Sequence, residues 1–299
     1  MTIADNSNSC IFVSICGAPN AGKSTLVNNM VGGKISIVSP KVQTTRVSVR
    51  GVCMQGSAQI VLVDTPGIFT PKRSLEKMIV EEAWKGVGET DVTALVIDAR
   101  KGICDDTKNI IKSLKESNNK KVILVLNKID KINRDRLLPL TKEINDYADF
   151  DRTFMISAIK GNGIDDLKKY LADIAPKGPW MFPEDEMSDA PLRFMAAEIT
   201  REKLFLILQQ ELPYSIAVET EKWEDCKDGS IKINQVIYVE KSNQKSIVLG
   251  KGGKNIKIVG EKARNELGRI LNTKIHLFLF VKIKENWTQR PQLYTGYNS

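Results

Sequence analysis

A glycine-rich run that ends in a lysine and a hydroxyl occupies Gly17–Ser24, with the sequence GAPNAGKS. It follows an apolar run and opens a helical pattern, which is the context required of a G-x-x-x-x-G-K-[ST] phosphate loop. Its backbone N–H groups would surround a phosphate at the positive end of the helix dipole. Lys23 would reach the β- and γ-phosphates, and the Ser24 hydroxyl would bind Mg²⁺. A simple glycine turn is much the weaker interpretation in this context.

Two further segments supply oxygen atoms and a glycine for the same metal and phosphate. Asp64-Thr65-Pro66-Gly67 closes an apolar run, so its carboxylate can hold the magnesium shell and the Gly67 N–H can sense the γ-phosphate. Between the first helix and the second strand, Gln43-Thr44-Thr45-Arg46 offers a hydroxyl that would complete that shell. We favour Thr45, with Thr44 as the close alternative and a solvated loop as the non-functional interpretation.

A third loop, Asn127-Lys128-Ile129-Asp130, indicates which purine base the nucleotide carries. A carboxylate accepts two hydrogen bonds only from a base edge with adjacent N–H donors, which guanine has and adenine lacks. Asn127 would tie this loop to the phosphate loop and face the purine N7, while the stem of Lys128 covers a ring face. A helix cap at Asp130 is the competing interpretation. After the sixth strand, Ser157-Ala158 would offer a backbone N–H to guanine O6.

The nucleotide site as predicted therefore draws on loops that follow several strands. The expected nucleotide contacts are Gly17, Asn20, Ala21, Gly22, Lys23, Ser24, Thr25, Asp64, Gly67, Asn127, Lys128, Asp130, Ser157 and Ala158. Magnesium would be held by Ser24, Thr45 and Asp64, and the catalytic groups would be Lys23, Thr45, Gly67 and Asn20.

The elements that position these loops alternate between short apolar runs and helical patterns from Ile11 to about Ala175, which is typical of βα units. The second and third strands are joined only by Gln55–Ser57, so this pair should be an antiparallel hairpin in an otherwise parallel sheet of six. The predicted strands are Ile11–Cys16, Val47–Met54, Ile60–Val63, Val92–Ile97, Val122–Leu126 and Thr153–Ile156.

A break in periodicity divides the chain. Four prolines and an acidic cluster between Pro176 and Pro191 indicate a linker. We therefore expect an α/β domain over residues 1–175, a linker over 176–191, and an α+β domain with a tail over 192–299. The second domain should begin with a long helix, Leu192–Leu212, followed by strands at Ser215–Trp223 and Ile231–Glu240, a glycine turn, a helix to about Leu271 and a strand at Lys274–Lys282.

Composition limits the remaining function classes. The chain of 299 residues is 42% hydrophobic and 27% charged, with no apolar run long enough for a membrane span, and Met1–Cys10 does not resemble a signal peptide. We expect a cytoplasmic protein whose five scattered cysteines are reduced and structural. From Ala190 onward, 18 Lys and Arg face 12 Asp and Glu, which favours a polyanionic partner for the second domain.

That second domain carries a candidate nucleic-acid loop at Gly250-Lys251-Gly252-Gly253, between two helical patterns. The arrangement matches a KH module, in which a GxxG loop brings two helices together and lets a nucleic-acid backbone lie against it. GxxG alone is commonly a turn, but the basic helix after it and strands on both sides favour the KH interpretation. His276, the only histidine, lies in a strand pattern and is expected to be structural.

The five nucleotide-site segments resemble the translation-factor class of GTPases. Ile68 stands just after D-x-x-G, where small GTPases carry a water-orienting glutamine, so slow hydrolysis without that group is expected. In GTPases of this kind, an asparagine at the position of Asn20 is associated with a potassium ion, and the resemblance implies the same here.

Taken whole, the chain resembles the Era family of ribosome-associated GTPases, through GAPNAGKS, QTTR, DTPG, NKID, the linker, VLGKGGKNIK and the tail Trp287–Tyr297. The resemblance implies a type II KH domain that binds 16S rRNA near its 3′ end, assistance to small-subunit assembly, some association with the inner membrane surface, and a monomer. Carried onto this sequence, Lys251 and Lys254 would contact RNA phosphates, and Trp287 and Tyr297 would offer ring faces to unstacked bases.

Two other interpretations use the same residues differently. The second domain would act as an adaptor for a protein or a membrane if the GxxG turn bound no RNA. A P-loop ATPase or nucleotide kinase is disfavoured by Asn127 and Asp130.

Overall fold

The computed structural model describes residues 8–41, 44–71, 73–117, 121–209 and 212–287. Its internal contacts divide the chain into two compact units. The first comprises Met1–Ser36 and Thr45–Asp189, and the second comprises Ile37–Thr44 and Ala190–Ser299. Each unit has its own sheet and its own buried core. No helix among the described residues combines the length and apolarity needed to cross a membrane.

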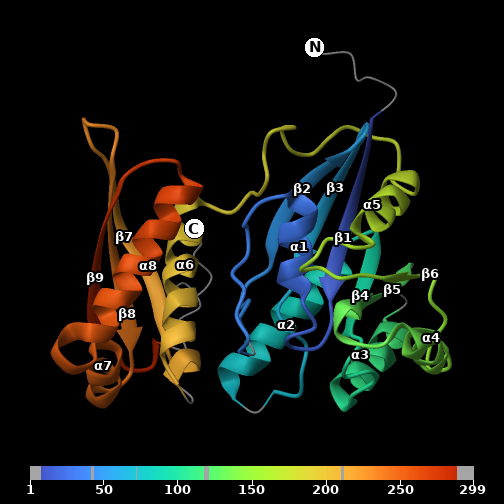
Figure 1. The fold of residues 1–299 in the computed structure, drawn as a ribbon, viewed down its shortest axis with the longest axis horizontal. Coiled ribbons are helices and arrows are strands. Elements are labelled where there is room, and N and C mark those ends of the chain that lie inside the picture. The colour runs from blue at the N-terminus through green and yellow to red at the C-terminus, as the bar shows by residue number, and fades with distance from the viewer. Residues whose placement is uncertain (1–7, 42–43, 72, 118–120, 210–211, 288–299) are drawn as a thin grey trace. The chain divides into compact units, whose positions relative to one another are not determined.

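The first unit is built on a six-stranded sheet in the order β2-β3-β1-β4-β5-β6 (Figure 1). Only the β2–β3 pair is antiparallel, which confirms the predicted hairpin and the mixed, mostly parallel sheet. The strand ends differ from the predicted ones by one or two residues in most cases. The strands are β1 Ser9–Cys16, β2 Val49–Gln55, β3 Ala58–Asp64, β4 Val92–Asp98, β5 Val122–Asn127 and β6 Arg152–Met155.

Helices cover both faces of this sheet, because its strands are apolar on both sides. Helices α1 (Lys23–Val31) and α5 (Ile164–Asp173) contact β1, β2 and β3 on one face. Apolar residues of α2 (Ser74–Gly88), α3 (Asp105–Glu116) and α4 (Leu137–Asn145) pack with β1, β4 and β5 in a second core. Since β1, β3, β4 and β5 point the same way, the loops that follow them meet at one edge of the sheet.

The predicted linker is bonded to the first unit over most of its length. Residues 177–189 run along the β2–β3 side of that unit, and we call them the strap. The Val52 N–H donates to Met187 O at 2.9 Å, and the Ser188 hydroxyl donates to Arg50 O at 2.7 Å. The buried Gln59 side chain accepts the N–H groups of Met181 and Phe182 and donates to Phe182 O. Edge strand β2 is thereby covered, as unpaired strand edges usually are.

The second unit has the order α-β-β-α-α-β expected for a KH domain. Its sheet runs β7-β8-β9, with β7 antiparallel and β9 parallel to β8. The first helix ends at Ile207, earlier than predicted, because Leu208 is extended and Leu212–Ser215 form a separate 3₁₀ turn around Pro213. The elements are α6 Leu192–Ile207, β7 Ala217–Asp225, β8 Ile231–Val239, α7 Ser242–Leu249, α8 Lys254–Ile270 and β9 Ile275–Ile283.

Candidate functional site

The phosphate loop owes its shape to two glycines that no other residue could replace. Gly17 and Gly22 have positive φ values of 147° and 99°. A Cβ on Gly17 would lie 2.3 Å from Val96 O, and one on Gly22 would lie 2.2 Å from Asn127 Nδ2. The loop therefore lies against both β4 and the Asn127 side chain, and α1 begins directly after it at Lys23.

Lys23 is 6% exposed, and its ammonium donates to Gly17 O at 3.0 Å and to Ala18 O at 3.2 Å. Desolvation lowers the pKa of Lys23 to about 8, with the nearby Asp64 carboxylate opposing that shift. A buried cation whose hydrogen bonds go to carbonyl groups gains a strong partner when phosphates arrive. The residue is therefore placed to bind the charge of a nucleotide.

Three oxygen-bearing side chains meet beside this lysine. The Ser24 and Thr45 hydroxyl oxygens lie 2.9 Å apart, and Asp64 is fully buried at the end of β3. Neither carboxylate oxygen of Asp64 has a well-formed hydrogen bond among the described residues, although the hydroxyls of Ser24 and Thr45 lie close enough to oppose the effect of burial. Burial raises the pKa of Asp64.

This arrangement fits Mg²⁺, which takes one or two carboxylate or hydroxyl oxygens and completes its octahedron with phosphates and water. In the described part of the chain no three His, Cys, Asp or Glu side chains cluster, so an all-protein metal cage has no candidate there. Of the two threonines weighed from sequence, Thr45 is the one near Ser24. The Thr44 hydroxyl instead donates to Lys41 O at 2.9 Å.

The DTPG loop closes over the phosphate loop through a glycine. A Cβ on Gly67 would lie 3.1 Å from Pro19 Cα, and the Ile68 N–H donates to Gly17 O at 3.2 Å. The Ile68 side chain is 5% exposed and packs in the core with Cys16 and Leu95. An apolar side chain turned into the core cannot orient a water molecule for attack on the γ-phosphate.

Asn127, 1% exposed, links three loops. Its Nδ2 donates to Ala21 O at 2.9 Å, and its Oδ1 accepts the N–H groups of Lys128 at 2.7 Å and Ala158 at 2.9 Å. The expected tie between this loop and the phosphate loop is therefore present. The expected role of the Ala158 N–H differs, since that group already bonds to Asn127 and the Ser157 N–H donates to Asn162 O. In this conformation both N–H groups donate to acceptors inside the protein.

Lys128 has a left-handed backbone, with φ of 66°, and its ammonium lies between two acceptors. It donates to Asn20 O at 2.5 Å and to the Asp98 carboxylate at 2.8 Å. Arg100 pairs with the same carboxylate, also at 2.8 Å. Although burial opposes it, hydrogen bonds from Arg100 and Lys128 bring the pKa of Asp98 down to about 2. Asp98 and Arg100 were not predicted as site residues, because their only signal in the sequence is a position at or just after the end of β4.

Asp130, which the sequence predicts to recognise the base, has one carboxylate oxygen in a hydrogen bond and one without. Its Oδ1 accepts the Ser157 hydroxyl at 2.7 Å, which is the main cause of the lowered pKa of Asp130. Its Oδ2 is buried without a hydrogen bond among the described residues, and the Lys131 ammonium lies 3.9 Å away. An ionised, partly unsatisfied carboxylate of this kind suits paired N–H donors on a base.

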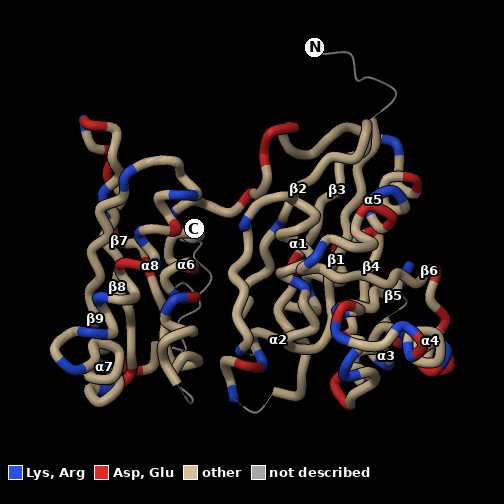
Figure 2. The backbone as a smooth tube through the Cα atoms, viewed as in Figure 1, with Lys and Arg blue, Asp and Glu red and all other residues tan. Residues whose placement is uncertain are grey.

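The GxxG loop of the second unit joins α7 to α8 by a close approach. A Cβ on Gly250 would lie 2.7 Å from Asn255 Cγ, and the Asn255 side chain donates to Ile247 O at 2.9 Å. Gly252 and Gly253 have φ values of 61° and 77°, and Gly253 caps α8. Exposed lysines along the loop and the first helical turn are Lys251, Lys254 and Lys257. Figure 2 shows Lys and Arg gathered where α7 and this loop lie.

Two aromatic residues near the C-terminus, Trp287 and Tyr297, were predicted to stack on RNA bases. Trp287 is fully buried, so its indole has no face open to an RNA base. The expectation that it stacks on RNA is therefore wrong for this structure, because an indole rich in apolar surface gains more by packing inside the protein. Tyr297 lies outside the described residues. His276 lies in β9, as expected from its strand pattern.

Comparisons with known proteins agree with this geometry. A family model described as a 50S ribosome-binding GTPase matches residues 12–128, and a KH domain model matches residues 211–288. The chain is 55% identical to GTPase Era of Brucella suis over 283 residues, which are 95% of this chain and 91% of that protein. It is 56% identical to GTPase Era of Rhizobium meliloti over 281 residues, 94% and 90% of the two chains.

Two solved structures are similar over nearly the whole length. One is Era in complex with MgGDPNP and nucleotides 1506–1542 of 16S ribosomal RNA, with 40% identity, a TM-score of 0.92 and coverage of 97% of this chain and 99% of that one. The other is a variant of Aquifex aeolicus Era bound to GDP·AlF₄⁻, with 40% identity, a TM-score of 0.91 and the same coverage. With both domain types matched and more than half of its residues identical to relatives over nearly their full length, the chain belongs to the Era family and is a GTPase.

Proposed function

We propose that this GTPase binds 16S ribosomal RNA near its 3′ end through the second unit and assists assembly of the small ribosomal subunit. The observation that carries the proposal is the GxxG loop, where Gly250 permits the helix approach and three exposed lysines follow. Its support is the similarity at 40% identity to an Era structure that contains nucleotides 1506–1542 of 16S rRNA. Residues 1–175 would change state between their GTP-bound and GDP-bound forms, and residues 192–299 would bind RNA.

The switch itself rests on the nucleotide site. GTP and GDP would be held by the phosphate loop and Asp130, and Mg²⁺ by Ser24, Thr45 and Asp64. Magnesium would neutralise charge on the β- and γ-phosphates. Lys23 would bind the same oxygens, and Gly67 would offer its N–H to the γ-phosphate. Thr25, beside Ser24 at the start of α1, would add a contact to the phosphates.

Potassium is a further part of the proposal, since Ile68 leaves hydrolysis without a polar side chain after DTPG. Asn20, with φ of 63° in the phosphate loop, is the residue that would hold the ion. Hydrolysis of GTP should be faster in KCl than in NaCl of equal ionic strength, and Asn20→Ala should remove that difference. Equal rates in both salts would contradict it.

The RNA proposal is tested by binding of a short single strand from the 3′ end of 16S rRNA, measured by fluorescence anisotropy at two salt concentrations with GTP or GDP present. Lys251→Glu with Lys254→Glu should weaken binding at least about tenfold, since each substitution removes a cation that would bind a phosphate. Lys262→Glu, on the same helix but away from the loop, is the matched control and should change affinity far less.

Absence of binding in both nucleotide states would overturn the proposal. It would favour the alternative in which the second unit is an adaptor for a protein or a membrane. Peripheral association with the inner membrane and a monomeric state stay predictions, to be tested by flotation with anionic vesicles and by sedimentation.

A further inference from the structure

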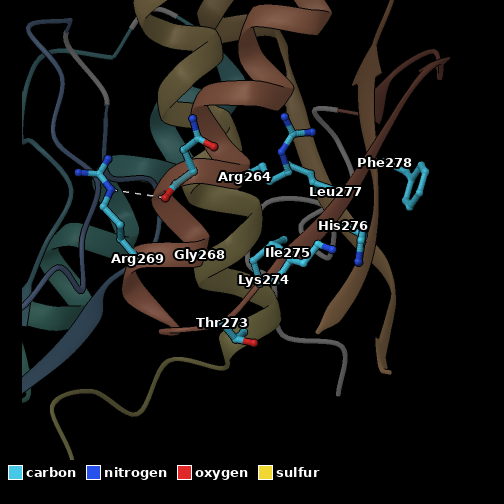
Figure 3. Close-up of a pocket in the computed structure, with 10 residues that line it drawn as sticks. Arg264, Gly268, Arg269, Thr273, Lys274, Ile275, His276, Leu277 and Phe278 are labelled. Atoms are coloured by element: carbon cyan, nitrogen blue, oxygen red, sulfur yellow. Dashed lines mark hydrogen bonds between the residues drawn. The ribbon is translucent and has the colours of Figure 1, made fainter. Parts of the chain in front are cut away.

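Among the described residues, polar side chains that could take a ligand differ in how deeply they are buried. In the second unit, the C-terminal part of α8 and the first half of β9 line a cavity of about 670 Å³, where Arg264 and Lys274 are exposed (Figure 3). Exposed cations keep their hydration, so they do not require a ligand. In the first unit, a buried serine hydroxyl lies beside the Asp64 carboxylate. An unbonded polar atom is costly when it is buried, so this hydroxyl is the stronger sign of a binding role.

The serine is Ser36, in the bend that follows α1. It is 5% exposed, and its hydroxyl has no well-formed hydrogen bond among the described residues. Buried polar groups of this kind are rare, and each one calls for a physical reason. The sequence did not indicate a role for Ser36, because it belongs to none of the five segments that were predicted to form the nucleotide site.

Asn28 fixes Ser36 to α1 by three hydrogen bonds. Its Oδ1 accepts the N–H groups of Ile35 at 2.9 Å and of Ser36 at 3.0 Å, and its Nδ2 donates to Ser36 O at 2.7 Å. Ile35 is 6% exposed and packs against β2, where a Cβ on Gly51 would lie 2.4 Å from Ile35 Cδ1. Because Asn28 is four residues after Ser24, the two side chains share a face of α1. Ser36 is therefore held on the side of α1 that carries the Ser24 hydroxyl.

The Ser36 hydroxyl thereby joins the oxygen atoms around Asp64. Burial raises the pKa of Asp64, and the hydroxyls of Ser24, Ser36 and Thr45 lie close enough to oppose that rise by hydrogen bonding. Neither the two carboxylate oxygens of Asp64 nor the Ser36 oxygen has a well-formed hydrogen bond among the described residues. These oxygen atoms have hydrogen-bonding capacity to spare, which suits an ion that carries bound water.

A hydroxyl fits this position because it can both donate and accept a hydrogen bond. Mg²⁺ takes one or two side-chain oxygens, and phosphates and water complete its octahedron. Ser24, Thr45 and Asp64 would supply the protein oxygens, so Ser36 is not needed as a further ligand. A hydroxyl that donates to a carboxylate fixes the direction of that carboxylate, and partners of this kind strengthen the binding of a metal ion.

We propose that Ser36 is a positioning residue of the magnesium site, whose hydroxyl donates to Asp64 and orients that carboxylate toward the ion and its bound water. The inference rests on the proposed magnesium site and adds a residue to it. Asn28 would act through Ser36, since it holds the backbone of that residue.

The test measures the affinities for Mg²⁺ and for GDP separately on the full-length protein. Release of a fluorescent GDP analogue is followed while free Mg²⁺ is varied, and the affinity for GDP is measured again in EDTA. Ser36→Ala should weaken the apparent affinity for Mg²⁺ about tenfold and leave the affinity for GDP in EDTA unchanged. Ser36→Thr keeps the hydroxyl and should retain most of the Mg²⁺ affinity. Electron paramagnetic resonance of free Mn²⁺ provides a second measure of metal binding that does not depend on hydrolysis.

Ser48→Ala is the matched control. The Ser48 hydroxyl is also buried without a hydrogen bond among the described residues, and a Cβ on Gly86 of α2 would lie 3.1 Å from it. It is not among the groups that shift the pKa of Asp64, so the affinity of this variant for Mg²⁺ should equal that of the wild type.

Asn28→Ala provides a second route to the same position, because it removes the three hydrogen bonds that hold the segment. It should also weaken Mg²⁺ binding, and adding Ser36→Ala to it should cost little more, since residues that act together are not additive. The melting temperature of each variant shows that it folds.

Four results would each overturn the inference. The first is a Ser36→Ala protein that binds Mg²⁺ as tightly as the wild type, and the second is an equal loss of GDP affinity with Mg²⁺ and in EDTA. The third is an equal loss of Mg²⁺ affinity in Ser48→Ala. The fourth is an equal loss in Ser36→Thr, which would show that the shape of the side chain matters and its hydroxyl does not.

Failure of the proposed magnesium site would look different. In that case Mg²⁺ would have no effect on the affinity of the wild-type protein for GDP, whereas failure of the inference alone would leave the wild-type effect in place.

Discussion

The Asp98 carboxylate lies 2.8 Å from the Lys128 ammonium, which in turn donates to Asn20 O in the phosphate loop. Asp98 is 4% exposed and Lys128 is 25% exposed, so the pair is only partly screened by solvent. The carboxylate therefore positions a lysine of the base-recognition loop against the phosphate loop. This connects the end of β4 to both the Asn127–Asp130 loop and the phosphate loop.

Asp98→Asn should weaken GDP binding roughly tenfold, or about 1.4 kcal/mol, because Lys128 loses its charged partner and its fixed direction. Titration with a fluorescent GDP analogue measures the change. Arg100→Gln is the control, since this more exposed partner of the same carboxylate should contribute about threefold or less. Equal effects of the two variants would show that Asp98 acts through the local fold.

Asp130→Asn should exchange guanine for xanthine specificity. The unbonded Oδ2 of Asp130 matches the adjacent N–H donors of guanine, whereas an asparagine amide can donate to the carbonyl that xanthine has in place of the amino group. Affinity for GTP should fall about a hundredfold or more, and xanthosine triphosphate should become the tighter ligand. Competition assays with both nucleotides decide the point. Lys131→Gln, whose ammonium lies 3.9 Å away, should leave specificity unchanged.

Asp64→Asn should stabilise the nucleotide-free protein. The same change should abolish the increase in GDP affinity that Mg²⁺ gives. The raised folded-state pKa of Asp64 means that the folded protein keeps a proton that the unfolded chain releases. Stability should therefore fall as pH rises from the unfolded value of 3.8 through the folded pKa. Removing the buried charge should therefore raise the melting temperature of the nucleotide-free protein at neutral pH.

Differential scanning calorimetry without nucleotide checks that stabilisation, and titration of GDP with and without Mg²⁺ checks the metal. A melting temperature below that of the wild type would show that the amide is worse accommodated than the carboxylate. If Mg²⁺ still increased the GDP affinity of the variant, the ion would be bound by residues other than Asp64.

Nucleotide binding should take up a proton at alkaline pH, since Lys23 has a pKa of about 8 in the nucleotide-free protein and phosphates would raise it. The uptake should be about 0.1 proton per nucleotide at pH 7 and about 0.5 at pH 8. Affinity should correspondingly fall as pH rises above 8. Calorimetry in buffers of different ionisation enthalpy measures the uptake. Guanosine, which lacks phosphates, should show none, and a flat profile for GDP would contradict the assignment.

Gln59→Ala should expose the strap to proteases. The variant loses the hydrogen bonds by which the Gln59 amide holds the backbone of Met181 and Phe182 against β3. Chymotrypsin should cleave near Phe182 about ten times faster than in the wild type. Gln55→Ala, a change of equal chemistry at the end of β2, is the control. Rapid cleavage of the wild-type strap would contradict the observed packing.

The fold was predictable where local signals and topology agree. The predicted connection at Gln55–Ser57 is too short for a crossover helix, and the structure has a hairpin there, joined by Gly56 and Ser57. GAPNAGKS between a strand and a helix is typical of a phosphate loop. Long-range pairings carried no such signal. Asp98 meets Lys128 across 30 positions, and Gln59 meets Phe182 across 123, so their roles depend on the folded sheet.

The sequence also did not indicate which residues of the candidate sites would be buried or hydrogen-bonded inside the protein. Trp287 looks like a base-stacking residue in the sequence but is enclosed by the protein. The Ala158 N–H, which was predicted to meet guanine O6, donates to Asn127 Oδ1 in the structure, a bond that the sequence did not indicate. In both cases the residue type suits the predicted role, and the burial or hydrogen bond inside the protein depends on the fold.

Because the strap is bonded to the first unit, it is not a flexible linker between the two units. A flexible linker of about sixteen residues would have a root-mean-square end-to-end distance of roughly 20–24 Å. The Arg50 guanidinium donates to the Asp189 carboxylate at 3.2 Å, and α6 begins at Leu192, so only residues 190 and 191 lie between the strap and α6. Most of the segment that joins the two units in sequence is therefore part of the first unit, held to β2 and β3, and does not act as a flexible spacer.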